Sequence, residues 1–409
     1  MRSSLLVGFV LLSSWIFAQT PVVFVHGMLA GSDTWMNAKQ VFSAAGYADD
    51  QLFFYDWNTL ARDREEAGKQ FEDFVKQALK ASKSKHISLV GHSAGGALCM
   101  NFIHENKLGK RVEKYVHVGS MPIANNPAVP TLNLYSTADL ITGGKSYEFE
   151  NVTNAVFENL DHYEIATDSS AVAAMLSFLG EGKRLEQAAS LTSRVALGGR
   201  VVTMGENEPE AAAQLAFYEL NPTTGERQTK TPLATIQTDK NGYWELDILR
   251  TGSFIEVIVE ATDPAKRKVH YYFECPQEKN DLIYFRTLPT SGFAAILFAS
   301  LPNNDQPCLV TYSASKALIH GRDSLFINEQ NIITEELASA QKTPIAFFVY
   351  TANEEVSDLS KIAAFGNFPF LSGVNYNFTQ HSISMAYADK SFTLPSLKSK
   401  TAIMVKIIL

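Results

Sequence analysis

Short apolar runs alternate with helical patterns between residues 21 and 180, and this alternation constrains the fold more than any other feature. The runs are nearly continuous, whereas the segment 61–82 places apolar side chains at helical spacing. Strands buried on both faces and separated by helices form a parallel sheet covered on each side. The expected strands are residues 21–25, 51–57, 87–91, 112–120, 131–137 and 154–160, and the expected helices are 36–47, 61–82, 95–106 and 169–180.

Beyond this unit the sequence changes to short β runs separated by turn sequences such as NPTTGE and DKNG. Many short strands at this spacing predict an all-β sandwich or barrel. We expect an α/β domain at residues 20–182, a polar linker at 183–195, and an all-β region at 196–409 that forms one or two units with a break near residue 276. The run AAILFAS, residues 294–300, is among the expected strands.

The N-terminus resembles a secretory signal. Residues 1–19 carry one arginine, then an apolar stretch that is too short to span a membrane, then FAQ. We therefore expect cleavage near Ala18 or Gln19, export to the periplasm or the medium, and no transmembrane segment. The net charge of −8 provides no basic footprint for nucleic acid and argues against a mainly charge-driven hold on anionic membranes.

A Gly-His-Ser-Ala-Gly turn joins the expected strand 87–91 to the next helix, with Ser93 at its centre. Three fixed positions of this kind recur by chance in roughly one chain in ten of this length. The setting between a strand and a helix is what a nucleophile elbow requires, and small neighbours let the two backbones approach closely. The sequence therefore predicts that Ser93 is a nucleophile.

Two further side chains follow Ser93 in the order of an acid and then a base. Asp139 lies just past the strand 131–137, and His162 lies in the loop after the strand 154–160. Ligand sites in open parallel sheets form beyond the carboxyl ends of the strands, where all three residues are expected. We predict that His162 takes the proton of Ser93 and that Asp139 orients and stabilises the imidazole.

The loop after the first strand, HGMLAGSDTW, supplies the remaining part of such a site. The backbone amides of Met28 and Ala94 are the expected donors to an oxyanion, because one follows the His-Gly pair and the other opens the helix after the nucleophile. The helix N-terminus adds partial positive charge at the same place.

Other residues of suitable type have simpler interpretations. Asp56 and Asp161 are the competing acids, but only Asp139 lies between Ser93 and His162 at a strand end. Asp161 is too close in sequence to His162 and is expected to shape the loop. His92 is expected to pack or hydrogen-bond behind the elbow, and His26 to organise the oxyanion loop.

The three cysteines do not form a disulfide scaffold, because their number is odd. Cys275 and Cys308 could pair in an oxidising compartment or stay free, and Cys99 is expected to be a small buried residue. No cluster of side chains has metal-ligand spacing, and the predicted chemistry needs neither a metal nor an organic cofactor.

Four segments resemble the signature segments of α/β-hydrolase lipases: PVVFVHGMLAGSDTW, VGHSAGG, YSTAD and DHYEIATD. Their spacing is similar to that of compact bacterial lipases without a large lid, and their order is similar to that of two-domain archaeal lipases. The segments AFYELNPTTGERQTKTP, PIAFFVYTANEEVSDL and PFLSGVNYNF resemble the C-terminal β-barrel of the archaeal enzymes. The resemblance implies a role of the all-β region with long-chain lipids.

One departure from the archaeal lipases concerns the lid. YDWNTLARDREEAG passes straight into the next helix, and only IANNPAVP separates two later strands, so no lid fits at either place. We therefore expect a static apolar rim formed by Met28, Leu29, Trp35, Met121 and Ile123, unless Trp35 packs the oxyanion loop instead.

These features together predict a secreted serine lipase or carboxylesterase that cleaves ester bonds, such as those of acylglycerols, through an acyl-enzyme. The expected partners are an ester or lipid substrate and, through the β region, a lipid interface. The alternatives are an esterase of short soluble esters, a polyester depolymerase, an acyltransferase, and a scaffold that only binds.

Overall fold

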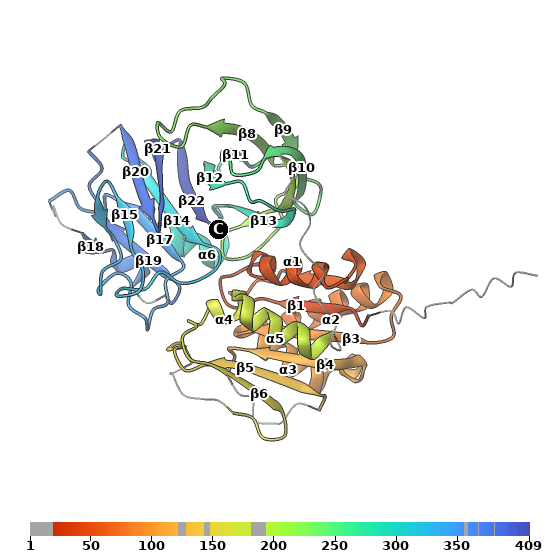
Figure 1. Cartoon of the computed structure of the whole chain (residues 1–409). Helices are drawn as coiled ribbons and strands as arrows, with labels where there is room; N and C mark the ends of the chain where they lie inside the picture. Colours follow the sequence, from red (N-terminus) through yellow and green to blue (C-terminus); the bar gives the residue numbers. More distant parts are fainter. Residues whose placement is uncertain are drawn as a thin grey trace, which may run out of the picture.

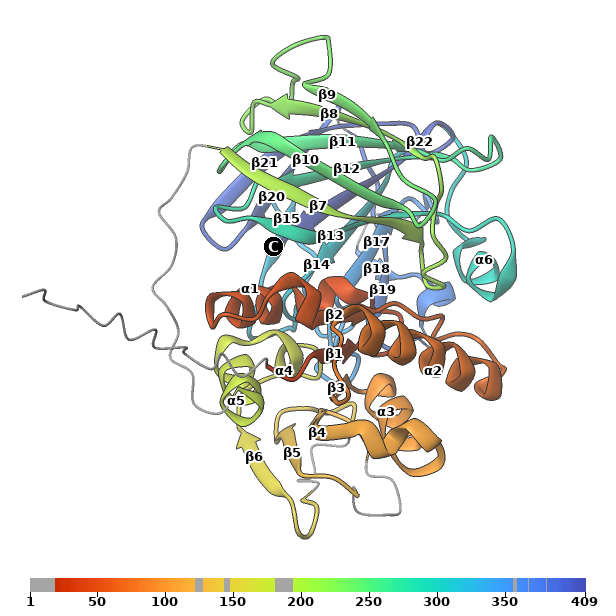
Figure 2. The ribbon, with the colours of Figure 1, turned by 90° about the vertical axis from the view of Figure 1, so that its right-hand side faces the viewer.

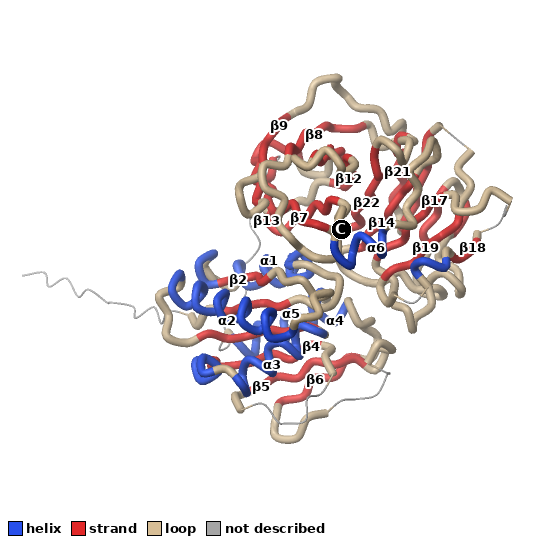
Figure 3. The backbone as a smooth tube through the Cα atoms, turned by 180° about the vertical axis from the view of Figure 1, so that it is seen from behind, coloured by secondary structure: helices blue, strands red, loops and turns tan. Residues whose placement is uncertain are grey.

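The computed structural model describes residues 19–121, 128–142, 148–180, 194–355, 359–366, 368–379 and 381–409. Most of the expected signal peptide, most of the expected linker and the rim residue Ile123 lie outside these ranges. The chain forms a helix-containing α/β unit and a second unit built almost wholly of strands, and the two are packed together (Figure 1, Figure 3).

The α/β unit is built on one parallel sheet, as the sequence predicts. Its strand order is β2-β1-β3-β4-β5-β6, and every neighbouring pair runs parallel. The ends of its strands on one edge can therefore meet around a common site. The strands are β1 Val22–Val25, β2 Leu52–Tyr55, β3 Ile87–His92, β4 Val112–Val118, β5 Thr131–Ser136 and β6 Thr153–Phe157.

Helices cover both faces of this sheet (Figure 2). Successive side chains of β1 enter different cores: Phe24 packs in one cluster with Phe42 of α1, and Val23 packs in another with Phe71 of α2. This is why the strands are continuously apolar. The helices are α1 Met36–Ala44, α2 Arg64–Ala81, α3 Ala94–Glu105, α4 Glu164–Thr167 and α5 Ser169–Leu179.

Strands form the second unit, which holds one nine-stranded sheet of order β18-β19-β17-β14-β22-β12-β11-β8-β9, one three-stranded sheet of order β10-β7-β13, and one four-stranded sheet of order β16-β15-β20-β21. The strands are β7 Arg194–Thr203, β8 Gln214–Leu220, β9 Ala234–Gln237, β10 Tyr243–Arg250, β11 Phe254–Glu260, β12 Lys268–Glu274, β13 Asn280–Thr287, β14 Cys308–Ser313, β15 Leu325–Ile327, β16 Gln330–Asn331, β17 Ala346–Tyr350, β18 Ser360–Lys361, β19 Leu371–Asn375, β20 Ser382–Tyr387, β21 Lys390–Pro395 and β22 Ala402–Ile408.

The nine-stranded sheet is the middle layer of this unit. Along β22, Ile403 and Val405 enter the core shared with the three-stranded sheet, whereas Met404 enters the core shared with the four-stranded sheet. The period of two along a strand explains this division. The fold class expected from the sequence, an α/β-hydrolase sheet followed by an all-β region, is confirmed.

Two details of the all-β region concern residue 276 and the expected strand at residues 294–300. Strands from both sides of residue 276 share the nine-stranded sheet, because β22 pairs with β12 on one side and with β14 on the other. The prediction of a strand at residues 294–300 is wrong, since a helix, α6 Gly292–Phe298, covers most of that segment. A short apolar run has no periodicity that separates strand from helix, and the three alanines of this run favour helix.

Strand β13 brings the two units together. Its residues Leu282 and Tyr284 belong to the same buried cluster as Trp35 and Phe42 of the α/β unit, so one core continues across the boundary.

All three cysteines are free and buried. Among the helices of the described residues, we find none with the length and apolar character needed to cross a membrane.

Candidate active site

Ser93 lies on a sharp turn between β3 and α3. Its backbone φ of +51° is in the left-handed region, which is uncommon for a residue with a side chain. A Cβ added at Gly95 would lie 2.4 Å from the carbonyl oxygen of Val25, and one added at Gly91 would lie 2.8 Å from Gly96. The small residues around Ser93 therefore let strand and helix cross closely, and the strained turn presents the serine at the edge of the sheet.

The structure brings Ser93, His162 and Asp139 together in one hydrogen-bonded chain. Nε2 of His162 is 2.8 Å from Oγ of Ser93, and Nδ1 of His162 is 2.7 Å from Oδ2 of Asp139. A neutral imidazole with its proton on Nδ1 satisfies both contacts, donating to the carboxylate and accepting from the hydroxyl. The three residues follow β3, β6 and β5 respectively, at one edge of the sheet.

The Asp139 carboxylate is held in its charged form. Burial disfavours the charge, but the hydrogen bonds from His162 and from Thr142 outweigh it and lower the pKa of Asp139. Its Oδ1 accepts the backbone amides of Ile141 and Thr142 at 3.0 and 3.1 Å. Asp139 and His162 are each only 1% exposed, so the pair operates away from solvent.

His92 binds the backbone of His162. Its Nε2 donates to the backbone carbonyl of His162 at 2.7 Å, and the two rings are 5.0 Å apart. Burial lowers the pKa of His92 to about 3, which keeps the ring neutral next to His162. His92 therefore fixes the loop that carries His162.

The loop after β1 turns tightly beside Ser93. A Cβ on Gly27 would lie 3.0 Å from the Cβ of Ser93, and Leu29 has a φ of +60°. His26 fixes this loop, because its Nε2 accepts the backbone amide of Trp57 at 3.3 Å and its own carbonyl oxygen accepts the indole N–H of Trp57 at 3.1 Å.

The two predicted oxyanion donors belong to the elements that flank Ser93. Met28 directly follows Gly27 in the turn after β1, and Ala94 is the first residue of α3.

Among the described residues, no group of three or more His, Cys, Asp and Glu side chains is placed to hold a metal ion.

Two families of known proteins match parts of the chain. Residues 19–125 match the family described as Lipase (class 2), and residues 193–289 match the Lipase C-terminal domain. The chain is an α/β-hydrolase of the lipase and esterase class. It is a carboxylic ester hydrolase, and the first part of its second unit matches the Lipase C-terminal domain. We call the whole second unit, residues 194–409, the C-terminal domain.

Three solved structures are similar to part of this hydrolase. A monoacylglycerol lipase from Paleococcus ferrophilus is 15% identical over 40% of this chain and 96% of its own, with a TM-score of 0.31. The carboxylesterase CesB from Bacillus subtilis is 13% identical over 40% of this chain and 85% of its own, with a TM-score of 0.31. An esterase from Pyrococcus furiosus is 14% identical over 41% of this chain and 83% of its own, with a TM-score of 0.33.

The two competing acids of the hydrolase are engaged elsewhere. Asp56 pairs with Arg200 at 2.5 Å and accepts the hydroxyl of Tyr284 at 2.6 Å. Asp161 accepts the backbone amides of Tyr163 and Glu164, each at 2.9 Å, and so shapes the loop after His162. Both carboxylates therefore have structural partners.

The sequence does not predict that side chains of the C-terminal domain bind the loops that follow β1, β2 and β6. Three aspartates that follow strand ends of the α/β unit each pair with an arginine of the C-terminal domain, at distances of 2.5 to 2.8 Å: Asp33 with Arg286, Asp56 with Arg200, and Asp161 with Arg322. The side-chain amide of Asn207 also donates to the carbonyl of Ala30 at 2.8 Å. No local pattern in the sequence predicts these long-range pairs.

The expected apolar rim is only partly present. Met28 and Met121 are 39% and 57% exposed, whereas Trp35 is fully buried against Phe24 and so packs below the oxyanion loop. Leu29 is half-buried and packs against the core of the C-terminal domain. Of the expected rim residues that the structure describes, Met28 and Met121 are therefore the exposed ones.

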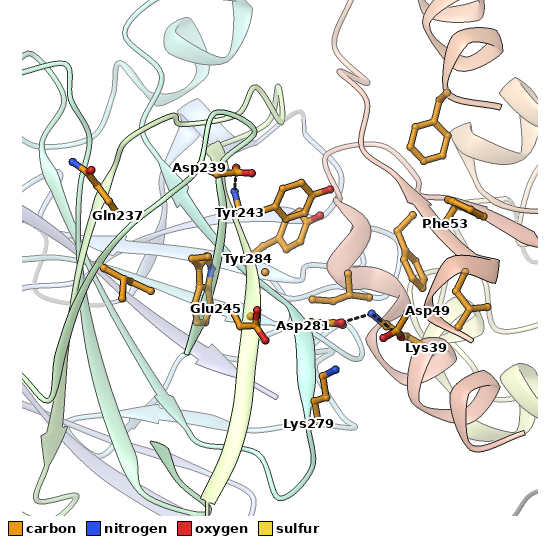
Figure 4. Close-up of a pocket in the computed structure, with 18 residues that line it drawn as sticks. Lys39, Asp49, Phe53, Gln237, Asp239, Tyr243, Glu245, Lys279, Asp281 and Tyr284 are labelled. Carbon is orange, nitrogen blue, oxygen red and sulfur yellow. Dashed lines mark hydrogen bonds and ion pairs between the residues drawn. The ribbon is translucent and has the colours of Figure 1, made fainter. Parts of the chain in front are cut away.

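A hollow of about 960 Å³ lies between the two units (Figure 4). Phe53 and Lys39 line it from the α/β unit, Tyr243 and Asp281 line it from the C-terminal domain, and Lys39 pairs with Asp281 beside it. None of the five predicted site residues lines this hollow, so it is separate from the candidate triad.

Proposed function

We propose that the hydrolase cleaves carboxylic esters at Ser93 through a covalent acyl-enzyme. The observation that carries the proposal is the hydrogen-bonded chain from Ser93 through His162 to Asp139. In the first step, Oγ of Ser93 attacks the ester carbonyl carbon while Nε2 of His162 takes its proton. The backbone amides of Met28 and Ala94 donate to the oxyanion that forms.

The remaining steps return the site to its starting state. The bond between the carbonyl carbon and the alcohol oxygen then breaks, and the imidazolium of His162 gives its proton to the departing oxygen. The acyl group stays bound to Oγ of Ser93 as an ester. Water then attacks the acyl carbon as His162 takes a proton from it, and the same proton returns to Ser93 when the carboxylic acid leaves. Asp139 stabilises the imidazolium during both steps.

The surroundings of Ser93 favour esters with an apolar acyl chain, such as acylglycerols. Met28 and Met121 leave apolar surface exposed next to the site. Unbranched methionine side chains adapt to alkyl chains of different shape. A lipid interface that contacts this rim and the C-terminal domain is the corresponding partner.

The acyl-chain profile tests this substrate class. We expect kcat/KM for p-nitrophenyl esters to rise from acetate to octanoate by about twofold for each methylene, because full burial of one methylene is worth about 0.8 kcal/mol and an open rim provides about half of that. The measurement is initial rates on a series of esters below their solubility limits.

Each outcome of that series has a clear interpretation. A maximum at acetate contradicts the lipase proposal and indicates an esterase of short soluble esters. Flat rates on monomeric esters combined with rapid release of soluble products from a polyester film indicate a depolymerase. Transfer of the acyl group to an added alcohol in preference to water indicates an acyltransferase, and no turnover of any ester indicates a binding scaffold.

We also infer that residues 1–19 direct export of the chain, on the basis of the arginine, the apolar stretch and the FAQ sequence. When the full chain is expressed in a bacterium with a periplasm, we expect the exported protein to begin at Gln19 or Thr20. N-terminal sequencing of the periplasmic and medium fractions measures this. Retention of Met1 on an active cytoplasmic protein would contradict it.

A further inference from the structure

The ring of the proposed base His162 is stacked on an aromatic ring from the other unit. Phe370 lies in the C-terminal domain, directly before β19, and its ring centroid is 5.6 Å from that of His162 with an angle of 19° between the planes. Phe370 is only 6% exposed. The imidazole that faces Ser93 is therefore covered by a side chain remote from it in sequence.

The backbone at Phe370 is held in an unusual conformation. Its φ is +70°, which a bulky side chain rarely adopts. Its amide donates to the carbonyl of Lys342 at 2.9 Å, and its own carbonyl accepts the amides of Ile345 and Ala346 at 2.9 and 3.1 Å. Strained residues persist where their surroundings over-determine them, and they concentrate at functional sites.

The packing around Phe370 joins the loops of the active site to the C-terminal domain. Phe370 shares a buried cluster with Ala30 of the loop after β1, with Tyr163 next to His162, and with Ile345 of its own domain. Arg322 holds the same loop through Asp161 at 2.8 Å. The ring thus lies between the loop after β1, the loop that carries His162 and the C-terminal domain.

We propose that Phe370 is a positioning residue of the catalytic centre, supplied by the C-terminal domain. Its ring keeps the imidazole plane of His162 in the orientation that directs Nε2 at Ser93, and its π face stabilises the imidazolium that forms when Ser93 loses its proton. A cation within about 6 Å of an aromatic centroid is attracted by the ring. The proposal rests on the proposed function, because it requires His162 to become charged during turnover.

Phe370→Leu tests the proposal, since leucine keeps an apolar side chain and removes the ring. We expect kcat for p-nitrophenyl acetate to fall about tenfold, with KM changed by less than twofold. Loss of a cation–π contact away from water lowers a rate constant that depends on it by roughly this factor. The acetyl group is too small to use the methionine rim, so the readout reports on the chemistry. The rates are given per amount of folded protein, and thermal unfolding shows whether each variant is folded at the assay temperature.

Phe365→Leu is the matched control. Phe365 is fully buried in the same domain and stacks on Phe348 with centroids 4.5 Å apart, so this variant also loses a stacked ring. We expect a lower Tm and an unchanged kcat. If Phe370→Leu does not fold, Phe370→Met replaces it, since its flexible side chain fills the same space.

Three results would overturn the proposal. Equal kcat in Phe370→Leu and the wild type would reduce Phe370 to a packing residue, as would equal losses in the Phe370 and Phe365 variants. A change confined to the KM of octanoate would make Phe370 part of an acyl pocket. Failure of the proposed function is distinguished by Ser93→Ala, which would then keep its esterase activity whatever the Phe370 variants do.

Discussion

Ser93→Ala is expected to lower kcat for p-nitrophenyl butyrate by roughly 10⁶-fold, because the substitution removes only the atom that forms the acyl-enzyme. A small residual rate above that of water remains, since the oxyanion donors still bind the carbonyl. The hydroxyl of Ser93 makes a single hydrogen bond within the described residues, to His162, so we expect the Tm to change little. Stopped and continuous rate measurements at a saturating ester concentration provide the test.

Ser88→Ala is the matched control for that loss. Ser88 is buried on β3, the strand that ends just before Ser93, and lies at its far end. We expect the wild-type rate from this variant. If both alanine variants were equally active, Ser93 would not be the nucleophile and the hydrogen-bonded chain to Asp139 would have another role.

Arg286→Met lowers the free energy of unfolding by about 3–5 kcal/mol, the second of the two largest effects we expect. Two guanidinium nitrogens of Arg286 contact the two carboxylate oxygens of Asp33 at 2.8 and 2.9 Å, and both residues are buried. Burial disfavours the guanidinium, but the Asp33 carboxylate outweighs it and raises the pKa of Arg286. Removing the arginine leaves a buried negative charge without its partner. Denaturant titration followed by fluorescence measures the change.

Two further variants separate the buried pair from a general effect of losing charge. Arg250 pairs with Glu219 at an exposed position, so Arg250→Met should cost less than about 1 kcal/mol. Asp33→Asn combined with Arg286→Met removes both charges and should recover part of the lost stability, because the unpaired carboxylate causes most of the cost. Equal losses in Arg286→Met and Arg250→Met would show that the interface pair has no special weight.

The Arg286 prediction concerns function as well as stability. Asp33 follows the loop that carries Met28, and the arginine that holds it belongs to the C-terminal domain. The other two arginine pairs hold the loops after β2 and after β6 in the same way. The C-terminal domain therefore helps to hold the loops around the candidate active site in place.

The sequence was sufficient to predict the α/β unit and which three residues would form the candidate triad. Continuous apolar strands between helices are typical of a covered parallel sheet, and such a sheet brings the residues after its strands to one edge. Ser93, Asp139 and His162 each follow a strand, so their proximity follows from local patterns once the sheet is assumed. The left-handed turn at Ser93 follows from the small residues beside it.

The contribution of the C-terminal domain was not predictable in this way. Arg286, Arg322 and Phe370 lie far from their partners along the chain, and each is an ordinary residue in its own strand or loop. Their roles depend on how two units dock, which no periodicity records. The sequence also predicts a strand where α6 lies, because a short apolar segment has no period that separates strand from helix.

Covalent labelling is the most direct test of the claim that Ser93 is the nucleophile. The protein is inactivated with a p-nitrophenyl alkylphosphonate, which releases one nitrophenolate for each active site and leaves a stable adduct on an activated serine. Digestion and mass spectrometry then locate the adduct. We expect one phosphonate per chain, on Ser93, with no labelling of Ser93→Ala. An adduct on a different residue of the active wild type, or full labelling of Ser93→Ala, would contradict the assignment.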